Sequence, residues 1–172
     1  LMAALAYDAI YETLSSRERK ELAEDLLRLG VEPSLGDWVV EPTRIHSLNS
    51  MGHNWWTSCV YNGGMLAMAL QNELPEAVEW VETLNEAMPE WFGFAGDVLQ
   101  AKIKSFDEAG GMYESLNYAN FGIQEALQYR IAWQNTHPGR KAPELPQLER
   151  LPDYFVQVCY PRTGILYNLN FG

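Results

Sequence analysis

The stretch GGMYESLNYANFG, residues 110–122, combines two phenols, one carboxylate and several glycines. Tyr113 and Tyr118 are five positions apart, and Glu114 directly follows the first of them. Such a pattern is typical of a turn anchored by hydrophobic side chains. It is equally typical of a loop whose backbone lets a sugar approach phenolic oxygens. Glu114 could in addition lie near a helix N-terminus, where a negative charge is favoured.

A second stretch, HNWWTSCVYNGG, covers residues 53–64 and places a polar amide before a long uncharged segment. Asn54 stands where a helix begins, and asparagine is a preferred N-cap residue. Gly63 and Gly64 fall inside the same helix, where each glycine costs about 1 kcal/mol relative to alanine. Either close helix packing or a ligand near the backbone must offset that cost, and packing is the more frequent reason.

The elements that would position these stretches are mostly helical. The segment LMAALAYDAIYETL at the start is rich in helix formers. Ser15 and Glu18 then form a capping-box pattern, and Gly30 marks the predicted end of that helix. Its apolar positions recur at helical spacing, at Leu22, Leu26 and Leu29. The glycines, proline and aspartate of GVEPSLGDW, residues 30–38, predict a loop.

Residues 54–72 contain no charged side chain, so a helix there is expected to be buried on every side. Pro75 opens a further helix that is expected to be half exposed, with one apolar stripe at Ala77, Val78, Val81, Leu84 and Met88. More helices are predicted at residues 118–133 and around 148–160, followed by an irregular or short extended tail. The fold class is therefore all-α, a single domain over residues 1–172 built of antiparallel helical hairpins.

The composition excludes some classes of function. A net charge of -11 with scattered basic residues argues against nucleic-acid binding and mildly against a strongly sulfated ligand. The uncharged region of residues 45–72 contains histidines, asparagines and glycines, so no membrane span is expected. Cys59 and Cys159 form no disulfide framework. His46, His53 and His137 lack metal-ligand spacing, so neither a metal nor another cofactor is predicted.

At the two stretches the sequence resembles the heparinase II/III-like family. HNWWTSCVYNGG is similar to that family's NNWN-x-x-CNGGL inner-helix signature, and DEAGGMYESLNYANFG is similar to its DGGWYEGPxYWxYG segment. The tail YNLNFG resembles the start of the family's NFGDS. The resemblance implies an (α/α) toroid followed by a β-sandwich. This chain would then be a partial toroid without the sandwich, and a periplasmic or secreted location would be expected.

The same resemblance implies cleavage of a uronate-containing polysaccharide by β-elimination. A neutral donor stabilises the enolate-like intermediate, a base removes the C5 proton, and an acid protonates the leaving oxygen at C4. Asn54 matches the carboxylate-neutralising asparagine and Tyr118 the acid or base. His53 precedes Asn54, whereas the family commonly has a histidine after the asparagine, where this chain has Trp55. The implied substrate-binding residues are Trp55, Trp56, Tyr113 and Glu114.

Two other readings stay open. A glycoside hydrolase would need two carboxylates across a cleft, and the candidates are Asp97, Asp107, Glu108 and Glu114. A non-catalytic glycan-binding or structural domain would use Trp55, Trp56 and Trp91 for stacking or packing. The expected partner is an acidic polysaccharide or oligosaccharide. Self-association is also expected, because half a toroid exposes apolar surface of its inner helices.

Overall fold

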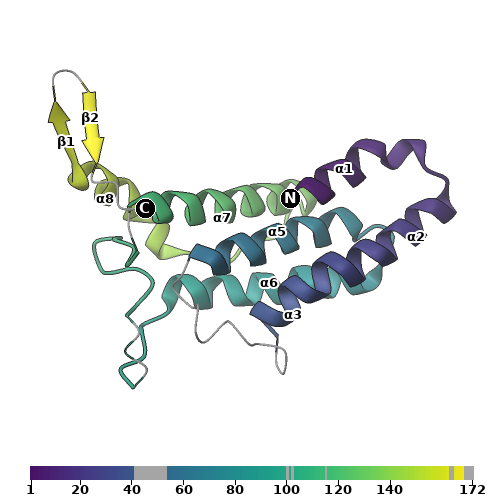
Figure 1. Ribbon diagram of the computed structural model, residues 1–172, viewed down its shortest axis with the longest axis horizontal. Helices are drawn as coiled ribbons and strands as arrows, with labels where there is room; N and C mark the ends of the chain where they lie inside the picture. Colours follow the sequence, from purple (N-terminus) through teal and green to yellow (C-terminus); the bar gives the residue numbers. More distant parts are fainter. Residues whose placement is uncertain (41–53, 100, 102, 115, 163–164, 169–172) are drawn as a thin grey trace.

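The computed structural model describes residues 1–40, 54–99, 101, 103–114, 116–162 and 165–168, with side chains through Val158. The molecule is mostly helical, as predicted (Figure 1). Its α-helices are α1 (Met2–Ile10), α2 (Ser16–Leu26), α3 (Glu32–Trp38), α5 (Asn54–Leu70), α6 (Pro75–Gly93), α7 (Leu116–Thr136) and α8 (Leu151–Val158). Shorter elements are the 3₁₀ turns Tyr11–Thr13 and Pro146–Glu149, a π-helical turn at Leu27–Val31, and the strands β1 (Cys159–Arg162) and β2 (Ile165–Asn168).

The N-terminal helices confirm the capping box but not the predicted loop. The Ser15 hydroxyl accepts from the backbone N–H of Glu18, and the Glu18 carboxylate accepts from the backbone N–H of Ser15. The helix does not end at Gly30, because a π-helical turn carries the chain directly into α3. A Cβ at Gly30 would lie 2.7 Å from Leu66 Cδ2. This glycine therefore permits close packing against α5 and does not end the helix.

The π-helical turn also changes which leucines of this region are buried. Leu27 and Val31 enter the core together with Ala23, whereas Leu29 of the predicted stripe is exposed. In α6 the predicted stripe is buried except for Val78, which is also exposed. The predicted helical spacing is therefore confirmed in both segments. Each predicted stripe contains one residue, Leu29 or Val78, that lies outside the buried face.

Helix α5 is the centre of the packing, and its glycines lie at helix contacts. A Cβ at Gly64 would lie 2.1 Å from Leu84 Cδ2 of α6 and 2.8 Å from Tyr129 Cε2 of α7. A Cβ at Gly63 would lie 2.9 Å from the Ser34 hydroxyl of α3. Close helix packing, and not a ligand, accounts for the glycine pair.

Helices α5 and α7 lie side by side and run parallel, while α6 runs antiparallel to α5 (Figure 1). Early residues of α5 meet early residues of α7, since a Cβ at Gly122 would lie 3.0 Å from the Thr57 hydroxyl. The Thr136 hydroxyl at the end of α7 reaches the Met68 sulfur near the end of α5. Helix α1 also packs on α5. The described helices therefore form two layers, with α1, α5 and α7 in one and α2, α3 and α6 in the other.

The two layers differ in charge. Helix α5 has no charged residue, and α7 has only Glu125 and Arg130. Helix α2 is mostly charged, and α6 carries the five glutamates Glu76, Glu79, Glu82, Glu86 and Glu90. Within the described chain, the layer containing α5 and α7 is thus the less charged one, although α7 keeps an exposed face.

An aromatic cluster fixes one end of the core. Trp56 stacks on Trp91 with ring centroids 5.8 Å apart, and Trp91 also contacts Phe92 and Phe106 edge to face. Phe106 lies after α6, in the loop that contains Gly110 and Gly111. It forms an isolated antiparallel bridge there with Met112. The cluster therefore attaches this loop to the helical core.

The C-terminal region leaves the helical layers. The 3₁₀ turn and α8 follow a loop after α7, and a two-stranded hairpin projects from the body (Figure 1). Its strands pair antiparallel, with Cys159 opposite Asn168 and Arg162 opposite Ile165. The predicted helix around residues 148–160 is thus split in two and ends at Val158, and part of the expected extended tail forms this hairpin.

Candidate functional site

Asn54 and Glu114 form the contact that joins the two stretches singled out from the sequence. The backbone N–H and Nδ2 of Asn54 both donate to Oε2 of Glu114, at 2.7 and 2.8 Å. Asn54 is 5% exposed and is the first residue of α5. The Glu114 carboxylate is therefore at a helix N-terminus, where the helix dipole favours an anion. It also fixes the orientation of the Asn54 amide.

A pocket of about 400 Å³ opens beside this contact, between the start of α5 and the first half of α7. Asn54 and Tyr118 both line it, and Tyr118 is 38% exposed. The remaining lining side chains are amides and one aromatic ring, from Asn117, Asn120, Phe121 and Gln124. The six lining residues that the structure describes are uncharged types at neutral pH, and Tyr118 is the one among them with an acidic hydroxyl.

The two tryptophans after Asn54 have opposite environments. Trp55 is 64% exposed. Trp56 is 1% exposed, donates from Nε1 to the Trp38 carbonyl at 3.3 Å and stacks on Trp91. The resemblance implies that Trp56 contacts substrate, whereas in the structure its ring is part of the core. Trp91 is equally buried and also packs rather than binds. His53 lies outside the described residues.

Tyr113 is separated from the Asn54–Tyr118 pocket. It is exposed and lines a smaller pocket of about 240 Å³ together with Lys104, Asp107 and Tyr154. Burial, together with the nearby Asp107 carboxylate, raises the pKa of the Tyr154 phenol. Of the four expected substrate-binding residues, Trp55 is thus exposed, Glu114 orients Asn54, Tyr113 faces a neighbouring pocket, and Trp56 is buried.

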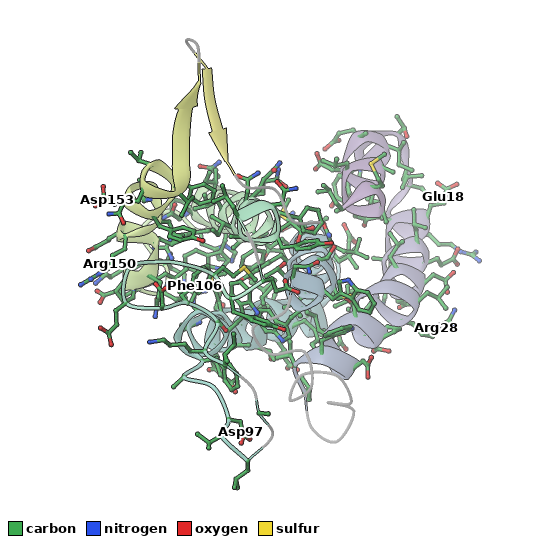
Figure 2. All side chains as sticks on the ribbon, turned by 60° about the vertical axis from the view of Figure 1, so that its left-hand side comes forward. Glu18, Arg28, Asp97, Phe106, Arg150 and Asp153 are labelled. Atoms are coloured by element: carbon green, nitrogen blue, oxygen red, sulfur yellow. The ribbon has the colours of Figure 1, made fainter. Side chains whose placement is uncertain are left out.

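The hydrolase candidates are scattered, and the carboxylates of three of them, Asp97, Asp107 and Glu114, accept from backbone N–H groups. Asp97 lies on a loop that projects from the body (Figure 2), and its Oδ1 accepts from the Leu99 N–H. Asp107 Oδ1 accepts from the N–H groups of Ala109 and Gly111, both at 2.8 Å. Neither Asp97, Asp107, Glu108 nor Glu114 appears among the residues that line the Asn54–Tyr118 pocket.

Glu125 is a polar residue of interest that sequence reasoning did not select. It lies on α7 two turns after Tyr118, and its Oε1 accepts from the Ser58 hydroxyl and from Asn62 Nδ2, both at 3.2 Å. Burial raises the pKa of its carboxyl, and hydrogen bonds from Ser58, Thr57 and Asn62 together with the charge of the N-terminal amine oppose that rise. It is the sole carboxylate of α5 and α7. That isolation is the signal by which the sequence could have revealed it.

Among the described residues, no cluster of three or more His, Cys, Asp or Glu side chains could hold a metal ion. No helix in the described part of the chain has both the length and the apolarity to cross a membrane. In comparisons with known proteins, no family model, no curated protein and no solved structure matches this chain significantly. The functional assignment therefore depends on the geometry of the site.

Proposed function

We propose that this chain is a polysaccharide lyase-like domain that cleaves a uronate-containing glycan by β-elimination. The observation that carries the proposal is that Asn54 and Tyr118 line the same pocket, whose volume of about 400 Å³ is within the range of small-ligand sites. These two residues lie 64 positions apart, on different helices. They were selected from the sequence for complementary steps of one reaction.

In the proposed reaction, the Asn54 amide donates to the uronate carboxylate while Tyr118 exchanges a proton with the sugar. An amide NH2 has two donor hydrogens, so donation to Glu114 and to a bound carboxylate are chemically compatible. The negative charge that develops as the C5 proton leaves is stabilised by such a fixed donor. Tyr118, as the titratable lining residue, removes the C5 proton or protonates the O4 leaving group.

The helix arrangement supports the toroid part of the proposal. In an (α/α) toroid, successive inner helices run parallel and each is followed by an antiparallel outer helix. Helices α5, α6 and α7 have this relation, and α5 with α7 is the less charged pair. We propose that α1, α5 and α7 are inner helices. On this assignment the Asn54–Tyr118 pocket opens on the inner side of the toroid.

The glycoside hydrolase reading has less support. Hydrolysis needs two carboxylates on either side of the scissile bond. The described lining of the Asn54–Tyr118 pocket consists of amides and aromatic groups. Asp107 and Glu108 line a different pocket, and Glu114 is occupied in holding Asn54.

One observation favours a second candidate, a non-catalytic glycan-binding domain. Amides hydrogen-bond to sugar hydroxyls, and an exposed ring such as Trp55 stacks on a sugar face. Elimination needs both a base and an acid, whereas Tyr118 is the single titratable side chain among the described residues of the lining. In this reading the same pocket binds a glycan and leaves it intact.

The experiment is to incubate the protein with alginate, hyaluronan and heparan sulfate and to follow ultraviolet absorbance of the unsaturated uronate. The proposal predicts an absorbance increase with at least one polymer. Binding of a polymer without any absorbance increase, by protein shown to be folded by circular dichroism, would instead support the glycan-binding candidate. Release of reducing ends without the absorbance increase would support hydrolysis.

A further inference from the structure

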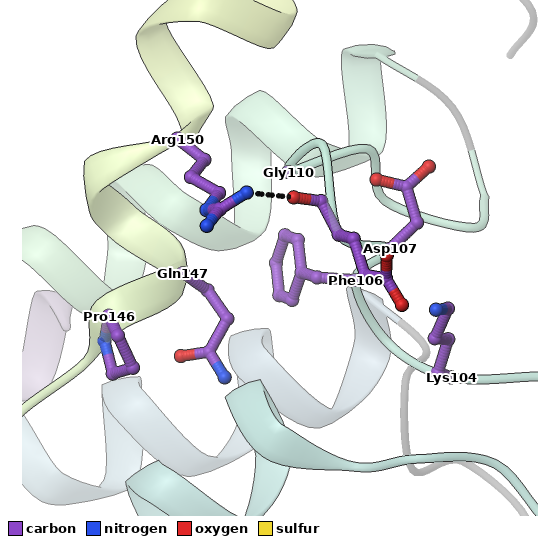
Figure 3. Close-up of a pocket in the computed structure, with 8 residues that line it drawn as sticks. Lys104, Phe106, Asp107, Gly110, Pro146, Gln147 and Arg150 are labelled. Atoms are coloured by element: carbon purple, nitrogen blue, oxygen red, sulfur yellow. Dashed lines mark hydrogen bonds between the residues drawn. The ribbon is translucent and has the colours of Figure 1, made fainter.

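A second pocket, of about 470 Å³, is lined by the loop that contains Gly110 and by the segment that leads into α8 (Figure 3). Lys104 and Arg150 line it from opposite sides, with Phe106 between them. Its other lining residues are Asp107, Glu108, Gly110, Pro146 and Gln147. The lining thus combines cations, carboxylates, one amide and apolar groups, whereas the described lining residues of the Asn54–Tyr118 pocket are uncharged types.

The distribution of ion pairs makes these two cations unusual in a chain with a net charge of -11. Most basic side chains that the structure describes pair with a carboxylate, namely Arg17, Arg19, Lys20, Arg28, Arg140 and Lys141. In the same described part of the chain, Lys104, Arg130 and Arg150 form no ion pair with a carboxylate. Two of these three line one pocket.

The loop opposite Arg150 is held in a defined shape. Arg150 Nη1 donates to the Glu108 carbonyl at 2.7 Å, the contact drawn as a dashed line in Figure 3. Gly110 has φ of +89°, and a Cβ there would lie 3.0 Å from the Arg150 carbonyl carbon and oxygen. The Asp107 carboxylate is used within the loop, by the N–H groups of Ala109 and Gly111. These contacts fix the pocket wall while leaving the Arg150 guanidinium further donors.

We propose that this pocket is an anionic-sugar subsite in which Lys104 and Arg150 bind carboxylates of a uronate oligosaccharide. Two cations on opposite sides suit carboxylates carried by successive sugars better than they suit one small anion. The Gln147 amide and the Glu108 carboxylate are suited to sugar hydroxyls. The proposal depends on the proposed function for its substrate class and adds where the charge of that substrate is recognised.

The position of this pocket relates it to the proposed reaction site. Lys104 and Asp107 line both this pocket and the smaller one that contains Tyr113. The next residue, Glu114, holds Asn54. The subsite would therefore bind sugars a short distance along the glycan from the residue that Asn54 and Tyr118 engage. Lys104 and Arg150 would bind the carboxylates of the neighbouring sugars. The Asn54–Tyr118 pocket would bind the sugar undergoing reaction.

The test measures binding by isothermal titration calorimetry in a Tyr118→Phe background, so that cleavage does not consume the ligand. The probes are tetrasaccharides of alginate, hyaluronan and polygalacturonate, with the carboxyl-reduced form of each as an uncharged counterpart. Lys104→Gln and Arg150→Gln should each weaken binding roughly two- to fivefold at low salt, as expected for exposed ion pairs. Carboxyl reduction should weaken it at least as much.

The matched control is Arg130→Gln. Arg130 also donates to a carbonyl, that of Pro143, and its loss changes the net charge equally, but it does not line the pocket. Arg130→Gln should therefore leave the affinity unchanged. The proposal is overturned if no tetrasaccharide binds, if Lys104→Gln binds like its parent, or if Arg130→Gln weakens binding as much. If Arg150→Gln fails to fold, the affinity of the Lys104→Gln variant alone decides the test, because Lys104 is exposed. Binding that depends on Lys104 would stand even if the wild type produced no unsaturated product.

Discussion

Asn54 donates two hydrogen bonds to one oxygen of Glu114, a residue 60 positions away in the chain. This contact joins the first residue of α5 to the segment just before α7, and it fixes the amide that we assign to the substrate carboxylate. The orientation of Asn54 and the position of Tyr118 at the start of α7 therefore depend on the same short segment.

Replacement of Glu114 by Gln tests this contact. The variant keeps the size of the side chain but loses the charge at the helix N-terminus, so both hydrogen bonds would go to a neutral amide oxygen. Because hydrogen bonds to a charged group contribute about 1.5–3 kcal/mol, we expect the free energy of unfolding to fall by about 1–2 kcal/mol. Urea denaturation measures it. Glu108→Gln, at an exposed carboxylate, is the matched control, and an equal loss in both variants would contradict the assigned role.

The helix contact at Gly64 predicts a loss of stability on Gly64→Ala. Alanine favours a helix by about 1 kcal/mol over glycine, yet its methyl group would overlap Leu84 and Tyr129. Overpacking of this kind costs about 1–3 kcal/mol, and a 2.1 Å approach places the cost at the upper end. We expect a clear fall in melting temperature, measured by circular dichroism.

Gly93→Ala provides the comparison for Gly64. Gly93 ends α6, and a Cβ there would meet nothing closer than Gln147 Nε2 at 3.9 Å. The melting temperature should stay the same or rise slightly. If Gly64→Ala were as stable as Gly93→Ala, the close approach of α5, α6 and α7 would be wrong.

Glu125 predicts a pH-dependent effect on stability. Burial raises the pKa of its carboxyl in the folded state, so folding favours the protonated form. Stability from this group is fully present below the unfolded pKa, near 4.5, and is lost as pH rises through the higher folded value. Glu125→Gln removes this titration. The stability of the variant relative to the wild type should therefore rise from pH 4 to pH 7.

Urea denaturation at several pH values measures the Glu125 effect. The Ser58 and Thr57 hydroxyls and the Asn62 amide do not titrate in this range, and the positive charge of the N-terminal amine opposes the rise in the Glu125 pKa. An exposed glutamate such as Glu21 is the control, because Glu21→Gln should show no such rise. A constant difference between Glu125→Gln and the wild type across the range would contradict the raised pKa.

Features of the fold that depend on neighbouring residues could be predicted from the sequence. Contacts between residues that are distant in the sequence could not. The Ser15–Glu18 capping box and the helix opened by Pro75 depend on neighbouring residues, and both are present. Gly30 was expected to end a helix, but its role is set by Leu66, which is distant in the sequence. No local pattern distinguishes a glycine that ends a helix from one that allows another helix to approach.

The same distinction applies to the candidate site. Asn54 and Tyr118 were selected from motif context, and they line one pocket. Trp55 and Trp56 are identical in type and adjacent, so only the direction of α5 decides that one is exposed and the other stacks on Trp91. The Lys104–Arg150 pocket joins two segments 46 positions apart through a loop shape that needs Gly110 at positive φ. Such a pairing could not be read from either segment.

The most direct test of the central claim compares Tyr118→Phe with Tyr113→Phe in the rate of unsaturated-uronate formation. Both variants remove one phenolic hydroxyl from an exposed tyrosine in the same stretch, but only Tyr118 lines the pocket with Asn54. We predict that Tyr118→Phe lowers kcat by about 100-fold or more, as loss of a general acid or base does, with glycan binding retained. Tyr113→Phe should keep most of the rate. Elimination that continues at the wild-type rate in Tyr118→Phe would contradict the account.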